Sequence, residues 1–279
     1  MIDYHVHTKY SGDSSAEIGG QLAAAAARGI EDICFTDHVD FDNPGGNFEP
    51  ADLAARHEEL KKYGGTYSVA LKTAGGLVTR GPVIIREGAE ISMARDPSCL
   101  EKTLAYLAPH ELDFIIGSVH CVDRNDVYYP EYHAGKTKAE AYLPYLETIA
   151  DCLPKYDFIS VLGHYDFVAK CAPYEDRSMS ADLSPAIRDA FERIFKTVVS
   201  MGKGIEINTA AWRSAPHWGL DVLSLYRRCG GEFVTFGSDA HRDSAVANRL
   251  DEARELALEA GIPYYATFER MKPTLHRIK

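Results

Sequence analysis

The sequence lacks a long hydrophobic run, a secretory leader and an excess of positive charge. No apolar stretch approaches the roughly 18 residues that a membrane-spanning helix needs, and the first residues, MIDYH, show neither part of a signal peptide. Lys and Arg number 30 against 41 Asp and Glu, a formal net charge of −11. Because no basic field exists to displace phosphate counterions, we expect neither a nucleic-acid partner nor a membrane partner. The expected location is cytoplasmic.

Paired cysteines and phosphate-binding glycine loops are also missing. The glycine pairs at 45–46, 64–65 and 75–76 match neither G-x-x-x-x-G-K-S/T nor G-x-G-x-x-G, and we interpret them as turns. The absence of a C-x-x-C pair excludes a zinc ribbon, and the scattered spacing argues against a disulfide framework. We therefore expect free, buried thiols. The six cysteines are Cys34, Cys99, Cys121, Cys152, Cys171 and Cys229.

The composition is that of an ordinary globular chain, with histidine as its unusual feature. Hydrophobic residues make up 46% and charged residues 25% of the 279 residues, which argues against disorder, collagen and coiled coil. With no Pro-rich or Ser-rich linker, one domain spanning residues 1–279 is expected. The chain has 11 histidines, and imidazole and carboxylate groups are the ligands that hold divalent metals.

Short apolar runs alternate with longer stretches of helical composition, the pattern of repeated strand–helix units. The predicted strands span residues 2–6, 32–36, 83–89, 114–119, 158–162, 204–208, 233–237 and 264–267. The predicted helices span residues 17–28, 51–63, 98–108, 137–153, 184–200, 219–229 and 244–260. The predicted loops span residues 39–50, 64–82, 121–136 and 209–218.

Seven or eight such units in one chain favour a closed or nearly closed (β/α) barrel, with an open doubly wound sheet as the alternative. Ser184 followed by Pro185 predicts a helix start, and Gly29, Gly202 and Gly261 predict helix ends. On a barrel, the loops after the strands would form the active face.

Histidines and acids gather at the carboxyl ends of the predicted strands. His5 and His7 lie two residues apart, so strand alternation sends both imidazoles to the same side. Asp239 and His241 repeat this spacing after the strand at 233–237. Because the strand ends of a barrel share one mouth, residues far apart in sequence meet there. The full set is His5, His7, Asp13, His38, Glu90, His120, His164, Asp239 and His241.

Any one of these histidines alone fits a hydrogen-bonded core or surface residue, but together they predict a metal site. The other five histidines lie in predicted helices, loops or the tail, and we interpret them as structural. They are His57, His110, His133, His217 and His276, of which His133 and His217 lie on loops that could touch a substrate.

The motifs that carry the nine residues resemble those of the PHP phosphoesterases, named for polymerase and histidinol phosphatase. They run along nearly the whole chain, as HVHTKYSGD, FTDH, GAE, GSVH, GHYD and GSDAH. Within that family the chain is most similar to the monofunctional histidinol-phosphatases, through its length and the segments ICFTDH, EINTAAWR and TFERMKP. The resemblance implies a distorted (β/α) barrel, usually of seven strands, with a trinuclear metal site.

By this resemblance, the nine residues are ligands of three divalent metal ions, and Glu90 bridges two of the ions. Asp37 is interpreted as a partner that orients a metal-bound imidazole. Zinc, iron and manganese all suit such ligands. Three ions would carry more positive charge than the three ligand carboxylates cancel, which leaves a surplus for hydroxide and a phosphate.

The implied activity is hydrolysis of L-histidinol phosphate to L-histidinol and phosphate, a stage of histidine biosynthesis. The implied chemistry is attack of a metal-bridging hydroxide on phosphorus. Catalytic roles fall to Glu90, Asp239 and His241, the last two as candidate helpers of the leaving group.

Cations and aromatic residues on the predicted loops are candidate substrate contacts. Arg213 and Lys170 would bind the phosphate, with solvated surface cations as the alternative interpretation. Tyr128, Tyr129 and Trp212 would flank the substrate's imidazole, although loop aromatics also serve local packing.

Three other functions stay open at this point. The first is a PHP phosphoesterase for another small phosphorylated substrate. The second is a nuclease or nucleotide phosphodiesterase, which the charge of −11 argues against. The third is a non-catalytic metal-binding module, which the intact ligand set argues against. The expected partner is a small phosphate monoester, and the oligomeric state is not predicted.

Overall fold

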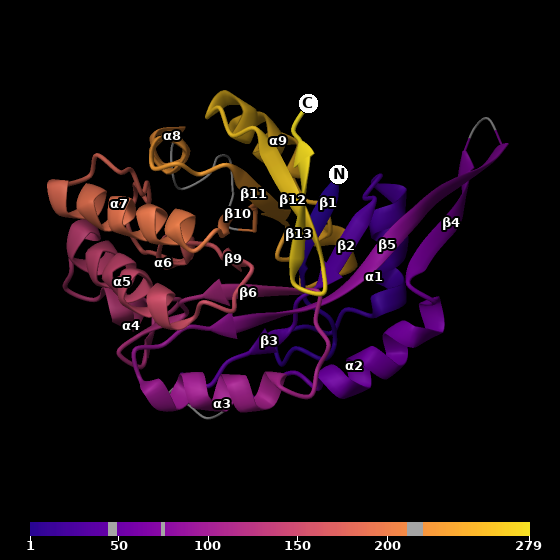
Figure 1. The fold of residues 1–279 in the computed structure, drawn as a ribbon, viewed down its shortest axis with the longest axis horizontal. Helices are drawn as coiled ribbons and strands as arrows, with labels where there is room; N and C mark the ends of the chain where they lie inside the picture. The colour runs from indigo at the N-terminus through magenta and orange to yellow at the C-terminus, as the bar shows by residue number, and fades with distance from the viewer. Residues whose placement is uncertain (44–48, 74–75, 211–219) are drawn as a thin grey trace.

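A mostly parallel sheet wrapped by helices forms the centre of the computed structural model, which describes residues 1–43, 49–73, 76–210 and 220–279 (Figure 1). The α/β prediction is therefore confirmed. Successive neighbours in the central series pair in parallel. In spatial order, these seven strands are β1 (Ile2–Val6), β2 (Asp32–Phe35), β5 (Gly76–Ser92), β6 (Phe114–Ser118), β9 (Val161–Leu162), β10 (Gly204–Asn208) and β11 (Phe233–Gly237).

The two ends of this series meet at a seam between β1 and β11. Ala240, just past β11, forms a parallel bridge with Val6. The His7 N–H donates to the Ala240 carbonyl at 2.9 Å, and the Ala240 N–H donates to the His5 carbonyl at 3.4 Å. The seven strands thus form the predicted distorted barrel, joined at the seam by a bridge rather than by a long ladder.

A C-terminal hairpin covers the amino-terminal end of the barrel. It consists of β12 (Tyr264–Glu269), which pairs in parallel with the start of β11, and the antiparallel β13 (Lys272–Arg277). At its turn, the Met271 N–H donates to the carbonyl of Asp113, the residue before β6. The Phe268 ring packs 4.9 Å from Phe114 and 6.4 Å from Tyr4, between ring centroids. The prediction of a strand at 264–267 is confirmed, whereas β13 was not predicted.

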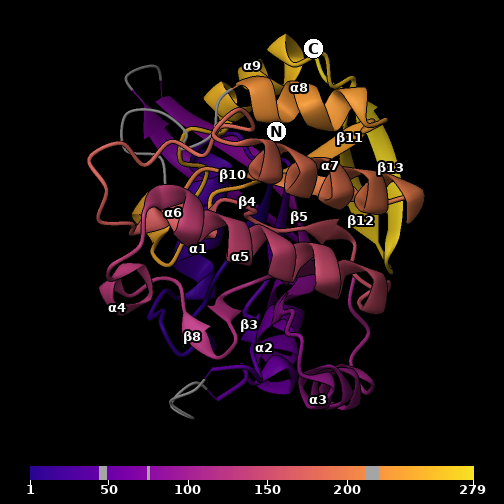
Figure 2. The same cartoon turned by 90° about the vertical axis from the view of Figure 1, so that its left-hand side faces the viewer.

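The helices cover the barrel and agree closely with the predicted ones. In Figure 2 the outer helices α5, α7 and α8 lie side by side. The Ser184 hydroxyl accepts from the Ile187 N–H at 3.2 Å and caps α7, as predicted. Gly29, Gly202 and Gly261 have φ between 68° and 77°, which a helix-ending glycine adopts without strain. The helices are α1 (Ile18–Ala27), α2 (Leu53–Leu60), α3 (Pro97–Leu107), α4 (Pro130–His133), α5 (Lys138–Cys152), α6 (Phe167–Lys170), α7 (Pro185–Ser200), α8 (Leu220–Arg228) and α9 (Leu250–Glu259), with short 3₁₀ turns at Lys61–Tyr63, Leu153–Lys155 and Asp243–Ala245.

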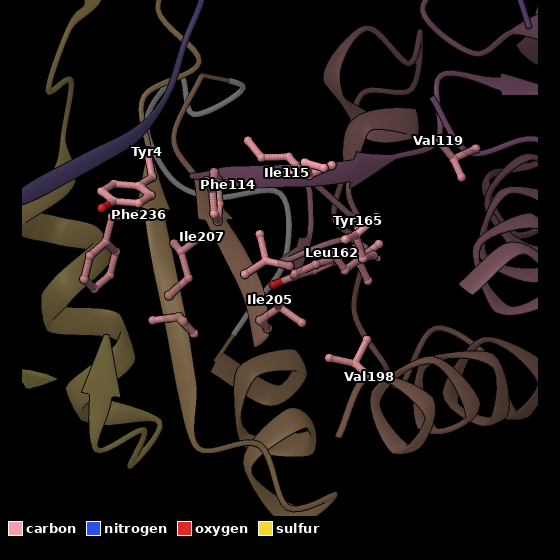
Figure 3. Packing of buried hydrophobic residues seen from close by; sticks show 14 of the residues in the cluster. Tyr4, Phe114, Ile115, Val119, Leu162, Tyr165, Val198, Ile205, Ile207 and Phe236 are labelled. Atoms are coloured by element: carbon pink, nitrogen blue, oxygen red, sulfur yellow. The ribbon is translucent and has the colours of Figure 1, made fainter. Parts of the chain in front are cut away.

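Apolar side chains from the strands and the covering helices form the core. Every residue of β1, β6, β10 and β11 is buried, because strands covered on both faces have no solvent side. Figure 3 shows Tyr4, Phe114, Leu162, Ile205 and Phe236, from five different strands, within this cluster.

The prediction of a loop over 64–82 is wrong. Residues Thr66–Thr73 form β4, which pairs antiparallel with the first half of β5 and projects from the body of the molecule (Figure 1). The glycine pairs in this segment favoured a loop, but β-branched and aromatic residues between them support strands. The predicted loops 39–50 and 121–136 also contain short elements, namely β3 (His38–Val39), β7 (Cys121–Val122), β8 (Asn125–Asp126) and α4.

None of the helices in the described ranges is long and apolar enough to cross a membrane. All six cysteines are free, four of them buried and two partly buried.

Candidate metal centre

The central side chain of the site is Glu90, which β5 places between histidines of other strands. Its Oε1 atom lies 2.8 Å from His164 Nε2 and 3.3 Å from His120 Nε2. Its Oε2 atom lies 3.1 Å from His5 Nε2 and 3.4 Å from His7 Nε2. Oε2 also lies 3.1 Å from His38 Nδ1. The two oxygens therefore face different sets of imidazoles, which is the arrangement a carboxylate shared by two metal ions requires.

Two residues just after β11, Asp239 and His241, lie beside His5 and His7 of β1 and its following turn. Asp239 Oδ1 lies 3.2 Å from His7 Nε2 and 3.7 Å from His5 Nε2. The His241 ring stacks on the His7 ring with centroids 4.2 Å apart. His241 Nε2 also lies 2.7 Å from Asp13 Oδ2, at the more exposed side of the site.

All nine predicted residues fall into groups that could hold a metal ion. Within each group, one ligand atom per residue lies within 4.8 Å of the others. The groups are His7, Asp13, His38 and His241; His5, His7 and Glu90; His5, His164 and Asp239; His38, Asp40 and His120; and Glu90, His120 and His164.

Two buried atoms at the centre test whether these residues fit a cation. His5 Nε2 and Glu90 Oε2 have no hydrogen-bond partner within the described ranges, although they lie only 3.1 Å apart. Buried polar atoms are normally paired, because an unpaired one loses its hydration without compensation. Two unpaired electron-donating atoms that face the same point fit a shared divalent cation, and oxygen and nitrogen donors suit such an ion.

Without a metal, the buried carboxylates and imidazoles shift one another's pKa values. Burial lowers the pKa of four imidazoles, but neighbouring carboxylates outweigh burial and raise it; these are His5, His38, His120 and His241, with the pKa of His38 at about 9. For His7, burial and the neighbouring imidazoles lower the pKa to about 4. Burial raises the pKa of Glu90 and Asp239, but nearby cations hold both pKa values well below the usual range. The cluster is thus strongly charged, and each buried charge depends on oppositely charged neighbours for its stability.

Two carboxylates of the site were not predicted. Glu206 on β10 places its Oε1 2.6 Å from His5 Nδ1. Asp40 Oδ2 lies 3.3 Å from His38 Nδ1 and 3.1 Å from His120 Nδ1. A charged residue in the middle of a largely apolar strand was the available signal for Glu206, and the two-residue spacing from His38 was the signal for Asp40.

The interpretation of Asp37 as a partner of an imidazole is wrong. Its carboxylate accepts hydrogen bonds from the Thr8 backbone N–H at 2.6 Å, from the Thr8 hydroxyl, and from Arg56 Nη1 at 3.0 Å. Asp37 therefore anchors the turn after β1 to helix α2, and Glu206 and Asp40 contact the imidazoles instead.

An open cleft of about 780 Å³ lies over the clustered ligands. Lys170 lines it, with Nζ 3.2 Å from Asp239 Oδ2. Burial lowers the pKa of Lys170, but Asp239 outweighs burial and raises it, so the ammonium stays charged. Tyr128 and Tyr129 also line the cleft, and their side chains are exposed. Arg242 lines the cleft as well, although it was not predicted to do so.

The structure places one of the four remaining candidate contacts. Arg213, Trp212 and His217 lie outside the described residues. His133 is buried, with Nε2 3.0 Å from the Val127 carbonyl, and serves local structure.

A family model described as PHP domain matches residues 3–210. This range includes eight of the ten residues in the possible metal-binding groups, all except Asp239 and His241. The chain belongs to the PHP domain family. This PHP-domain chain is 31% identical to a histidinol-phosphatase of Lactococcus lactis over 274 residues, which cover 97% of this chain and 95% of the relative. It is 25% identical to a probable histidinol-phosphatase of Clostridium acetobutylicum over 259 residues, 92% of each chain.

Solved structures show the same PHP architecture. A histidinol phosphate phosphatase from Lactococcus lactis, in complex with zinc, L-histidinol and phosphate, matches with a TM-score of 0.83 at 30% identity over 98% of both chains. Divalent-metal chemistry is thus supported for this fold, by the zinc of that relative and by the donor groups found in this chain.

Proposed function

We propose that this PHP-domain protein is a metal-dependent phosphomonoesterase that hydrolyses L-histidinol phosphate to L-histidinol and phosphate. The observation that carries the proposal is the arrangement of the nine histidine and acidic residues around Glu90 at the base of an open cleft. The similarity to a Lactococcus lactis enzyme crystallised with L-histidinol and phosphate, over 98% of both chains, supports the substrate. The functional unit is one domain spanning residues 1–279, and its cellular location is the cytoplasm.

We further propose that the site holds three divalent ions, of zinc, iron or manganese. The ligand groups would be His5, His7, Glu90 and Asp239; Glu90, His120 and His164; and Asp13, His38 and His241, with Glu90 shared. When bound, such ions supply a nucleophile at neutral pH and positive charge for the phosphoryl oxygens.

The chain's own residues position the substrate above this site. Lys170 contributes a fixed positive charge beside Asp239, where an anionic phosphate gains most from it. Arg213, which follows β10 in the sequence, would add a second cation that matches phosphate oxygens. Tyr128 and Tyr129 offer exposed aromatic faces in the cleft for the imidazole of the substrate.

Catalytic roles are assigned to three of the ligands. Glu90 fixes the two central groups relative to each other, because each oxygen faces one of them. Asp239 links the β1 histidines with Lys170. His241 is the most exposed of the proposed histidine ligands, at 27% of its side chain, so an ion that it helped to hold would lie on the open side of the site and would stabilise the leaving alkoxide.

Steady-state kinetics on purified, metal-loaded protein test the proposal. Phosphate release from L-histidinol phosphate should exceed release from p-nitrophenyl phosphate at least ~100-fold in kcat/KM, because only the former can use the cleft contacts. Equal values would refute the substrate and leave a general phosphatase. Faster cleavage of short single-stranded DNA would replace the proposal with a nuclease.

Metal analysis of the same sample tests the number of ions. Close to three equivalents of zinc, iron or manganese are expected per chain. Less than one equivalent after purification with added metal would contradict the trinuclear site.

A further inference from the structure

Glu206 makes a short, buried contact to a proposed metal ligand. Its Oε1 atom lies 2.6 Å from His5 Nδ1, and the two side chains are 1% and 0% exposed. The other nitrogen of the same ring, Nε2, faces Glu90 Oε2 at 3.1 Å. We propose that Glu206 is a positioning residue that orients His5, and through it the metal group around β1. This inference rests on the proposed metal-dependent function.

The second oxygen of Glu206 holds the carboxylate in place. Its Oε2 accepts the backbone N–H of His164 at 3.0 Å and the amide of Asn208 at 3.3 Å. One carboxylate thus contacts the side chain of one proposed ligand and the backbone of another. Because both oxygens are engaged, the Glu206 carboxylate has little freedom to turn, and its contact therefore fixes the orientation of the His5 ring.

The chemistry of the contact fixes the tautomer of His5. A carboxylate only accepts, so the proton of a neutral His5 ring lies on Nδ1 and is donated to Glu206. The lone pair then lies on Nε2, which faces Glu90. Such a carboxylate partner also makes the ring a stronger electron donor to a metal.

The contact crosses an intervening strand at a glycine. β11 lies between β10, which carries Glu206, and the seam with β1, which carries His5. A Cβ atom added to Gly237 would lie 2.1 Å from Glu206 Oε1 and 2.5 Å from His5 Cβ. Gly237 therefore provides the space in which the two side chains meet, which explains why a residue without a side chain ends β11.

The variant Glu206→Gln tests this role. It keeps the shape and an accepting oxygen but removes the charge, so Zn²⁺ should bind about 10- to 100-fold more weakly in chelator competition. The visible absorption of the Co²⁺-substituted protein should also change. The Tm of the metal-free variant should fall, because the substitution breaks a buried pair with His5. Circular dichroism therefore checks the fold, and the spectrum of the metal-free variant should match that of the parent.

Two further variants make the test specific. Glu87→Gln is the matched control, because Glu87 Oε1 lies 2.8 Å from Nδ1 of His57, a histidine outside the site; its Zn²⁺ affinity should equal that of the parent. Gly237→Ala should weaken Zn²⁺ binding as Glu206→Gln does, although it alters no charge.

The outcomes separate this inference from the proposed function. Unchanged Zn²⁺ affinity in Glu206→Gln, or a drop accompanied by an altered circular dichroism spectrum, would overturn the positioning role. Weaker Zn²⁺ binding by Glu206→Gln but not by Glu87→Gln, together with a parent protein that does not hydrolyse L-histidinol phosphate, would uphold the positioning role and refute the proposed function.

Discussion

Asp239 combines an unusual backbone conformation with several polar contacts. Its φ of 52° lies in the left-handed region, which Asn also tolerates. Its carboxylate lies 3.2 Å from His7 Nε2, 3.5 Å from His241 Nδ1 and 3.2 Å from Lys170 Nζ. A change to Asn therefore removes the charge and keeps the backbone.

We expect Asp239→Asn to lower kcat by at least ~100-fold, because the substitution removes the carboxylate of a proposed metal ligand. Circular dichroism and the Tm should show a folded protein. A variant that keeps kcat within threefold of the parent would show that Asp239 is not needed for catalysis.

Arg56 is a buried cation whose partners lie on two other elements. It is fully buried in α2, and its guanidinium donates to Asp37 Oδ2 at 3.0 Å and to the Gly88 carbonyl at 2.6 Å. Burial raises the pKa of Asp37, but Arg56, His7 and the Thr8 N–H together outweigh burial and lower it. The stabilisation from this carboxylate is therefore present above its unfolded pKa near 4 and is lost as the pH falls through its lower folded pKa.

Arg56→Met should reduce the free energy of unfolding by about 3–5 kcal/mol, because Asp37 stays buried without its charge partner. Urea denaturation at pH 7 measures this loss. Lys196→Met, which breaks the exposed pair with Glu192, is the control and should leave the urea midpoint nearly unchanged. Equal effects of the two substitutions would contradict the role given to Arg56.

At the level of elements, the β12–β13 hairpin supports the barrel from the end opposite the site. Phe268 is 3% exposed and packs between Phe114 and Tyr4. Phe268→Ala should cost about 3–5 kcal/mol of unfolding free energy and leave Zn²⁺ affinity unchanged, since the ring touches no proposed ligand.

Leu275→Ala in the same hairpin is the matched control. Leu275 is 43% exposed, so its truncation should cost far less in the same urea experiment. A parallel loss of Zn²⁺ affinity in Phe268→Ala would mean that the floor of the barrel also determines the geometry of the site.

Local patterns in the sequence were sufficient for elements whose signals are local. The cap at Ser184 and the glycine ends of the helices depend on neighbouring residues, and their predicted positions are confirmed. The β4 hairpin was missed because glycine pairs favour turns, while strand pairing depends on a partner that the local pattern does not show. The strand β13 was missed for the same reason, because it pairs with β12 across a short turn.

The same distinction applies to the site. Residues such as His5 and Glu90 were grouped correctly because the carboxyl ends of parallel strands meet at one mouth. Glu206 was missed because its contact with His5 depends on the order of strands around the barrel. Asp37 was misassigned because its nearest cation, Arg56, comes from a helix that sequence spacing does not place beside it.

At the scale of the whole molecule, proton and metal binding compete for the same buried imidazoles. In the metal-free protein, imidazoles such as His38, with a pKa of about 9, bind protons more tightly when folded than when unfolded. Their stabilisation is full below pH 6.5 and is lost as the pH rises through the folded values. Burial instead lowers the pKa of His7 to about 4, so between that value and pH 6.5 only the unfolded state binds a proton at this residue. This destabilisation disappears as the pH rises past 6.5.

Metal binding must displace these protons, so its apparent strength rises with pH. The increase in Tm on adding Zn²⁺ should therefore be larger at pH 8.5 than at pH 6.5, whereas the Tm of metal-free protein falls over the same interval. Differential scanning calorimetry with and without Zn²⁺ measures both. A metal-induced increase that shrinks with pH would contradict the assignment of these imidazoles as ligands.

The seam of the barrel gives the proposed ions a mechanical consequence. His5 and His7 lie on its β1 side, and Asp239 and His241 lie on its β11 side, where Ala240 bridges to Val6. Ions held by both sides would link β1 to the residues after β11, which are otherwise joined at the seam by a bridge rather than by a long ladder. Chelation should then accelerate amide hydrogen exchange at His7 and Ala240 more than at the continuous β5–β6 ladder. The strand ends of the barrel would thus form the metal site, and the bound ions would in turn stabilise the closed barrel.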